Sequence, residues 1–185
     1  DFIDGISLDM DSWTETTWSA WVYFNDVTTV QKIFFTGEDA GWGSRGFALP
    51  GGGTFRWEVG NGSSQSVVTF APNLGEWYHI VGTATEEGNV VLYVNGIEND
   101  TDPITTFGNS NTDFDIGMHA NAHNEFFNGS IDEVKIWNRT LSAEEVYQQY
   151  ASNLKKIDSD YWELYINQSK NATEGLAEGN YTYQV

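Results

Sequence analysis

The sequence contains no cysteine, and only 8 Lys and Arg stand against 27 Asp and Glu among its 185 residues. Without cysteine the chain forms neither disulfides nor thiolate metal sites, although this does not exclude an exported protein. The formal net charge is −19, and no base precedes Lys32. We therefore expect no nucleic-acid partner, because neutralising phosphates requires Lys and Arg. The acidic balance instead favours a solvated, self-repelling surface and also suits divalent cations.

Long apolar runs are also missing. No stretch approaches 18 apolar residues, so we expect no membrane insertion. The sequence has no initiator Met and no apolar signal-peptide segment, which leads us to expect a mature or excised soluble segment.

Aromatic side chains, in contrast, are abundant: they make up 15% of the residues and include 8 Trp. This composition and length predict one folded core with room for an appendage. Several runs alternate between two faces with the period of β-strands, and Gly and Asn are frequent between them. These runs are residues 16–24, 53–59, 65–70, 76–85, 89–97 and 129–137.

A helix start appears once, near the end of the alternating runs. Ser142 lies three residues before Glu145, the spacing of a capping box, and Leu141 is placed to pack against Val146. Many short strands with a single helix predict an all-β fold, an antiparallel two-sheet sandwich with one short C-terminal helix.

The pattern changes after Asn153. Two further strand-like runs, residues 157–167 and 180–185, surround a polar turn. Because two strands alone are only marginally stable in water, this hairpin needs a partner surface. We therefore divide the chain into a sandwich domain, residues 1–153, and an appended β-hairpin tail, residues 154–185.

The order of the motifs resembles the laminin G-like, concanavalin A-like lectin/glucanase superfamily, in its bacterial and archaeal LamG-like jelly-roll branch. The resemblance covers roughly residues 1–150 and implies a two-sheet jelly roll with ligand loops along its rim. Its opening, "DFIDG", is shorter than the first strand usual in the family, so either the start is cut off or another chain supplies an edge strand. The tail looks like the opening of an immunoglobulin-like module. The matching segments are "TTWSAWVYF", "KIFFTGE", "GEWYHIVGT", "VVLYVNGIE", "FDIGMH" and "FNGSIDEVKIWNRTLSAEEV".

Catalysis is not expected. Glucanases with this jelly roll use a Glu-x-Asp-x-x-Glu strand motif, because retaining hydrolysis needs two carboxyls about 5–5.5 Å apart. Asp113 and Asp115 share a strand face, but Gly117 or Met118 stands where the third acid would be. The sequence also has no Gly-x-Ser-x-Gly elbow and no phosphate loop.

Calcium is the cofactor that the resemblance implies. Asp132 is similar to the Asp that ligates a structural calcium at the sandwich edge in relatives, and the matching partners are Asp4 and the carbonyl of Gly37. Calcium prefers six to eight oxygen ligands, which can come from distant residues. The alternative is that Asp132 caps loop amides. Glu133, on the opposite face of a regular strand, is expected to be solvated.

Two other sets of side chains are weighed as binding residues. Trp42 lies in a Gly-rich loop near Arg45, and Trp stacks on sugar faces while Arg pairs with carboxylates. The alternative is a Trp folded back over the core. Trp21 and Tyr23 share one face of their run, so either the concave sheet carries them or a loop covers them.

Glycosylation motifs exceed the chance number. Sixteen Asn and 30 Ser and Thr predict two or three Asn-x-Ser/Thr triplets, yet there are seven, at Asn61, Asn99, Asn128, Asn138, Asn167, Asn171 and Asn180. This excess predicts an N-glycosylated extracellular or cell-surface protein.

These observations favour a non-catalytic module that acts in adhesion, or in self-assembly into a fibre or surface layer. Its partners would be copies of itself or neighbouring domains, because dense glycans leave assembly contacts as the free surface. The alternative is a calcium-dependent carbohydrate-binding module of a larger secreted protein. The stretch from Gly37 to Gly60 contains no sequon, which keeps that alternative open.

Overall fold

The computed structural model describes residues 2–6, 8–10, 12–36, 44–108, 114–119, 124–156 and 162–166. Within these residues the chain forms antiparallel strands and a single helix, α1 (Ala143–Ala151). The strands are β1 (Ile3–Ile6), β2 (Glu15–Phe24), β3 (Val30–Thr36), β4 (Arg45–Pro50), β5 (Phe55–Gly60), β6 (Gln65–Phe70), β7 (Trp77–Thr85), β8 (Gly88–Val94), β9 (Ile97–Ile104), β10 (Phe114–Ile116), β11 (Gly129–Trp137), β12 (Ser152–Lys156) and β13 (Trp162–Ile166).

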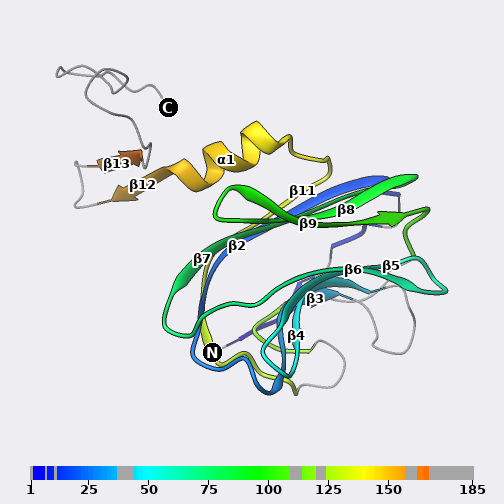
Figure 1. Cartoon of the computed structure of the whole chain (residues 1–185), viewed down its shortest axis with the longest axis horizontal. Coiled ribbons are helices and arrows are strands. Elements are labelled where there is room, and N and C mark those ends of the chain that lie inside the picture. The colour runs from blue at the N-terminus through cyan, green and yellow to red at the C-terminus, as the bar shows by residue number, and fades with distance from the viewer. Residues whose placement is uncertain are drawn as a thin grey trace.

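Two sheets pack face to face. The six-stranded sheet has the order β1-β10-β3-β4-β5-β6, and the five-stranded sheet has the order β11-β2-β7-β8-β9. Figure 1 shows them as two curved layers, with α1 on the outer side of the five-stranded sheet. β12 and β13 form a separate two-stranded hairpin that follows α1 directly. The predicted all-β jelly-roll sandwich with one short C-terminal helix is therefore confirmed, and a hairpin of β12 and β13 follows that helix.

An aromatic core fills the space between the sheets. Trp18 stacks on Phe34, with ring centroids 5.3 Å apart, and lies at the same centroid distance from Trp57. The Trp57 indole N–H donates to the carbonyl of Thr83 at 3.2 Å, so its polar atom is satisfied inside the core. Gly82 makes this packing possible, because a Cβ at that position would lie 2.6 Å from the Trp57 ring.

The helix begins as the sequence predicts. The Ser142 hydroxyl accepts the Glu145 N–H at 3.2 Å, and the Glu145 carboxylate accepts the Ser142 N–H at 2.9 Å, which completes a capping box. Leu141 and Val146 are buried together with Val81 of the five-stranded sheet. The helix therefore covers part of the outer face of that sheet.

Strand β9 was missed by the alternation argument, which placed a turn at its start. Most of its side chains are polar, and it contains Pro103, which would disrupt a central strand. β9 is an edge strand, paired only with β8 within its sheet, so Pro is tolerated there. The hairpin also contains a strand that was not expected, because β13 pairs with β12; the expected partner of β13, residues 180–185, lies outside the described residues. The division at residue 153 stays a prediction.

Candidate functional site

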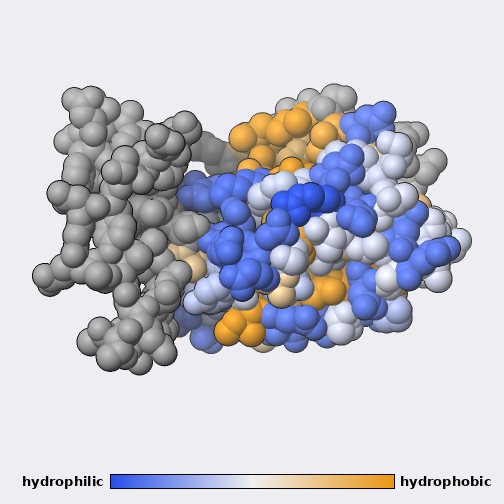
Figure 2. Space-filling model, turned by 90° about the horizontal axis from the view of Figure 1, so that it is seen from above, coloured by the Kyte–Doolittle hydropathy of each residue, from blue (hydrophilic) through white to orange (hydrophobic). Residues whose placement is uncertain are grey.

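A pocket of about 310 Å³ opens on the outer face of the five-stranded sheet, lined by Trp21, Trp77, Asp132 and Glu133. The pairing of three adjacent strands brings these residues together. Trp21 of β2 lies opposite Asp132 of β11 on one side and opposite His79 of β7 on the other. Trp77 is two residues before His79 and therefore shares its face of the sheet. Seen from the side of α1, the described surface is largely hydrophilic, with hydrophobic side chains gathered in patches (Figure 2).

The aromatic side of the pocket is rigid at one end and open at the other. Trp21 is half-buried, with its ring 5.2 Å from the His79 ring and 5.9 Å from the Tyr150 ring of α1. Trp77 is 46% exposed and lies 5.6 Å from the ring of Tyr23. A ligand in the pocket would therefore meet one fixed indole and one freely accessible indole.

The acidic side of the pocket depends on a β-bulge. The register of β11 against β2 shifts between Asp132 and Lys135, and Glu133 has a left-handed φ of 50°. The Asp132 carboxylate accepts the N–H of Glu133 at 2.7 Å, which holds the bulge. Glu133 pairs in turn with the Lys135 ammonium at 2.8 Å.

Glu133 is exposed, as expected, but the expectation that it lies on the face opposite to Asp132 is wrong. In a regular strand adjacent side chains face opposite sides of the sheet, but a bulge re-aims one of them. Here both acidic residues line the same pocket. The alternative that Asp132 caps loop amides stays a prediction, because the one N–H that its carboxylate is seen to accept belongs to Glu133 within β11.

His79 lies beneath the pocket and is 2% exposed. Its Nε2 is 3.1 Å from the Ser19 hydroxyl. Burial, and to a lesser degree the positive charge of Lys135, together lower the pKa of His79 to about 4. The imidazole is therefore neutral near pH 7, and it supports the Trp21 ring as an uncharged, packed strand residue.

The calcium ligands implied by the resemblance are only partly placed. Asp132 is exposed on edge strand β11, Asp4 lies in β1, and Gly37 lies outside the described residues. Among the residues that the structure describes, no group of three His, Asp or Glu side chains could hold a metal ion. Calcium at Asp132 stays a prediction.

The predicted rim pair is not observed as an exposed site. Trp42 lies outside the described residues, and Arg45 is only 1% exposed. The Arg45 guanidinium lies 4.6 Å from the Phe107 ring and donates to the carbonyl of Gly108 at 3.1 Å. Arg45 begins β4 and turns inward, so it supports the segment at Phe107 rather than a ligand; the expectation of an exposed Arg45 is wrong.

The acids considered for catalysis do not form an accessible pair in the described part of the chain. Asp115 is completely buried in β10, and Asp113 lies outside the described residues.

Four of the seven sequon Asn residues lie in the described structure. Asn128 and Asn138 directly precede and follow β11, as expected, and both are exposed. Asn99 is exposed on edge strand β9, while Asn61 caps a turn by accepting the N–H groups of Ser63 and Ser64. The sequons outside the described residues are Asn167, Asn171 and Asn180. Glycosylation at all seven stays a prediction.

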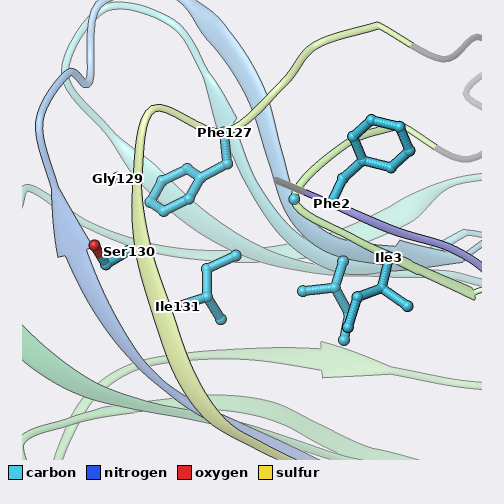
Figure 3. Close-up of a pocket in the computed structure, with 8 residues that line it drawn as sticks. Phe2, Ile3, Phe127, Gly129, Ser130 and Ile131 are labelled. Atoms are coloured by element: carbon cyan, nitrogen blue, oxygen red, sulfur yellow. The ribbon is translucent and has the colours of Figure 1, made fainter.

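A second pocket, of about 400 Å³, lies where edge strands β1 and β11 of the two sheets approach each other. Figure 3 shows Phe2 and Ile3 on one side of it and Phe127 and Ile131 on the other. Phe2 is 51% exposed, so apolar surface reaches solvent at this open side of the sandwich.

This architecture is similar to that of several known proteins. Adhesion G-protein coupled receptor D1 from Homo sapiens is 28% identical over 92 residues, 48% of this chain and 10% of the receptor. The botulinum neurotoxin serotype D binding domain superposes with a TM-score of 0.63 at 15% identity, over 77% of this chain and 37% of that chain. Domain 4 of an extracellular arabinanase from Geobacillus stearothermophilus superposes with a TM-score of 0.57 at 23% identity, over 74% and 66%.

The chain thus spans about a tenth of the receptor and little more than a third of the toxin chain. In the described part of the chain, no helix is long and apolar enough to cross a membrane. The sequence matches the family described as the Concanavalin A-like lectin/glucanases superfamily over residues 4–147, which include both sheets and the start of α1. The chain therefore belongs to the concanavalin A-like lectin/glucanases superfamily, in its laminin G-like branch.

Proposed function

We propose that this chain is a non-catalytic module through which a larger extracellular protein adheres to glycans. The observation that carries the proposal is the pocket formed by Trp21, Trp77, Asp132 and Glu133 on the outer face of the five-stranded sheet. Indole faces pack well against the apolar faces of sugar rings, and carboxylates accept hydrogen bonds from hydroxyl groups. Small-ligand sites usually combine aromatic side chains with a small number of polar groups.

The names of similar structures support this class of function. The arabinanase domain was solved in complex with arabinotriose, and a related botulinum neurotoxin binding domain was solved in complex with SialylT. The curated relative is an adhesion receptor. The exposed sequon residues Asn99, Asn128 and Asn138 add support for a surface location.

The arrangement of the two acids favours binding over hydrolysis. A glycosidase places its carboxyls on either side of the bond that breaks. Asp132 and Glu133 are adjacent residues of one strand and form one edge of the pocket. One of these carboxylates holds the bulge and the other holds Lys135, which are positioning contacts.

Self-assembly is the second candidate, and the apolar pocket between β1 and β11 favours it. Exposed Phe2 and Ile3 would be covered by contact with another copy. Strand addition is disfavoured at the same edges, because β1 has only 4 residues and β11 carries a bulge with charged side chains. We therefore rank glycan binding first.

The decisive experiment compares Trp77→Ala with Ile97→Ala in a screen of the whole chain against immobilised oligosaccharides. Both side chains are exposed, at 46% and 69%, but only Trp77 lines the pocket. We expect Trp77→Ala to weaken binding about three- to tenfold, the value of one aromatic contact, while Ile97→Ala changes nothing. If no oligosaccharide binds, or if the two variants behave alike, the proposal is wrong.

A further inference from the structure

We propose that the Trp21–Trp77 pocket selects a positively charged group, so that its preferred glycan is an amino sugar with a free ammonium. The inference rests on the glycan-binding function proposed above and adds the ligand class. The groups that line the pocket and the contacts that they make support this ligand class.

Each of the two acids has one partner at the edge of the pocket. Asp132 Oδ1 is engaged by the N–H of Glu133, and Glu133 Oε2 is engaged by Lys135. Each carboxylate has further lone pairs for a ligand. An ammonium group carries three donors, and its hydrogen bonds to carboxylates are about twice as strong as bonds between neutral groups.

The aromatic lining attracts the same kind of group. A cation over an indole face is stabilised by the negative face of the ring, with Trp the best of the aromatic residues. Trp21 and Trp77 line the pocket together with the two acids, and the Tyr23 ring extends the aromatic surface beside Trp77. Carboxylates and indoles therefore both attract an ammonium group.

The local charge excludes the opposite ligand. Two carboxylates, Asp132 and Glu133, and one ammonium, Lys135, leave the pocket with a charge of −1, within a chain of net charge −19. A sugar carboxylate would face two like charges across the pocket. Selectivity of this kind uses repulsion of the wrong ligand as well as attraction of the right one.

Lys135 allows the charge of the ligand to be tested separately. It pairs with Glu133 at 2.8 Å on the exposed side of β11, and exposed pairs of this kind are weak. A ligand ammonium would therefore share Glu133 with Lys135. Removing the Lys135 charge should strengthen ammonium binding and leave the binding of a neutral sugar unchanged.

The test measures binding of the whole chain to glucosamine oligosaccharides and to N-acetylglucosamine oligosaccharides of equal length, at a pH where the amine is protonated. We expect the amino form to bind at least tenfold more tightly. Asp132→Asn with Glu133→Gln should remove this preference, and Lys135→Gln should increase it. Asn retains the oxygen that accepts the Glu133 N–H, so the bulge is kept. The control, Glu98→Gln on β9, removes a charge outside the pocket lining and should leave the preference unchanged.

The outcomes separate the two proposals. Equal binding of both oligosaccharides to the unmodified chain, or a preference that Glu98→Gln reduces as much as the pocket variant does, overturns the ammonium inference. If the unmodified chain binds both oligosaccharides equally and Trp77→Ala abolishes this binding, the glycan site is supported and only its proposed ligand class is wrong. If the pocket variant does not fold, the unmodified chain and Lys135→Gln still decide, because each predicts a change in the ratio of the two affinities.

Discussion

The Asp132 carboxylate accepts the N–H of Glu133 at 2.7 Å, at the point where β11 shifts its register against β2. This bond turns an adjacent acid pair, which a regular strand would split between two faces, into one edge of a pocket. The same bulge, with its charged side chains, makes β11 a poor edge for pairing with another chain. Site formation and protection of the sheet edge thus have one structural cause.

The bulge gives the first prediction. Glu133 has a φ of 50°, a conformation in which a β-branched side chain is strained. Glu133→Val should lower the free energy of unfolding, measured by urea denaturation, by roughly 0.5–3 kcal/mol, because a β-branched side chain adds to the strain that Glu already bears. Ser130→Val, on the regular part of β11, is the control and should be neutral or slightly stabilising. Equal effects of the two substitutions would contradict the bulge.

Strand β11 shows which features of the site could be predicted from the sequence and which could not. Its alternation placed β11 correctly at 129–137, and Asp132 was identified as a candidate site residue. The left-handed turn at Glu133 was not predictable, because Gly is the usual signal for φ above zero and a Glu stands there. The error about the face of Glu133 follows from that single residue.

The remaining differences have similar causes. Alternation correctly separated Trp21 and Tyr23 from the core side chains. The face on which Trp77 lies could have been predicted in the same way, because Trp77 is two residues before His79 in the same run. Arg45 was misplaced because charge alone suggests exposure, whereas its guanidinium is buried against Phe107 and bonded to a carbonyl. Burial of this kind depends on tertiary partners that the local sequence does not show.

The second prediction concerns pH. The pKa of His79 is lowered from 6.5 to about 4 by burial and by Lys135, so between these values the unfolded chain binds a proton that the folded chain does not. Stability from this residue is therefore complete above pH 6.5 and falls as the pH drops toward 4, by roughly 3 kcal/mol at the limit. The difference in unfolding free energy between the unmodified chain and His79→Gln should change across this range. A constant difference from pH 7 to pH 4 would contradict the assignment.

The third prediction concerns calcium. An ion that binds only the folded state raises stability, by about 2.7 kcal/mol at a hundredfold excess over Kd. If calcium binds at Asp132, the melting temperature should rise with calcium, and Asp132→Asn should reduce the shift whereas Asp100→Asn should not. An unchanged melting curve in excess chelator would leave Asp132 as a bulge acceptor and pocket carboxylate only.

The fourth prediction concerns glycans on the protein itself. Asn128 and Asn138 are exposed in the described structure, so both are accessible to modification. Asn61 uses its side chain to hold a turn, and Asn99 Nδ2 donates to the Thr69 carbonyl at 2.8 Å, which should make both of them poorer acceptors. Peptide mass spectrometry of material from the native source should find sugar on Asn128 and Asn138 and less on Asn61 and Asn99. Unmodified Asn at every sequon would remove the main support for a surface glycoprotein.

The last prediction concerns the tail. Among the residues whose side chains the structure describes, both hydrophobic clusters that hold the sandwich and α1 consist of residues up to Val146, and Ala151 is the last residue of α1. Hairpin β12–β13 follows the helix directly and forms a separate sheet. Residues 1–153 should therefore fold alone, with a melting temperature within a few degrees of that of the full chain and unchanged binding at the Trp21–Trp77 pocket. Sedimentation of the two proteins over a range of concentrations then tests association: if the tail mediates self-assembly, only the full chain should form larger species. A truncated chain that fails to fold would contradict the division at residue 153, and identical sedimentation of both proteins as monomers would contradict a role of the tail in assembly.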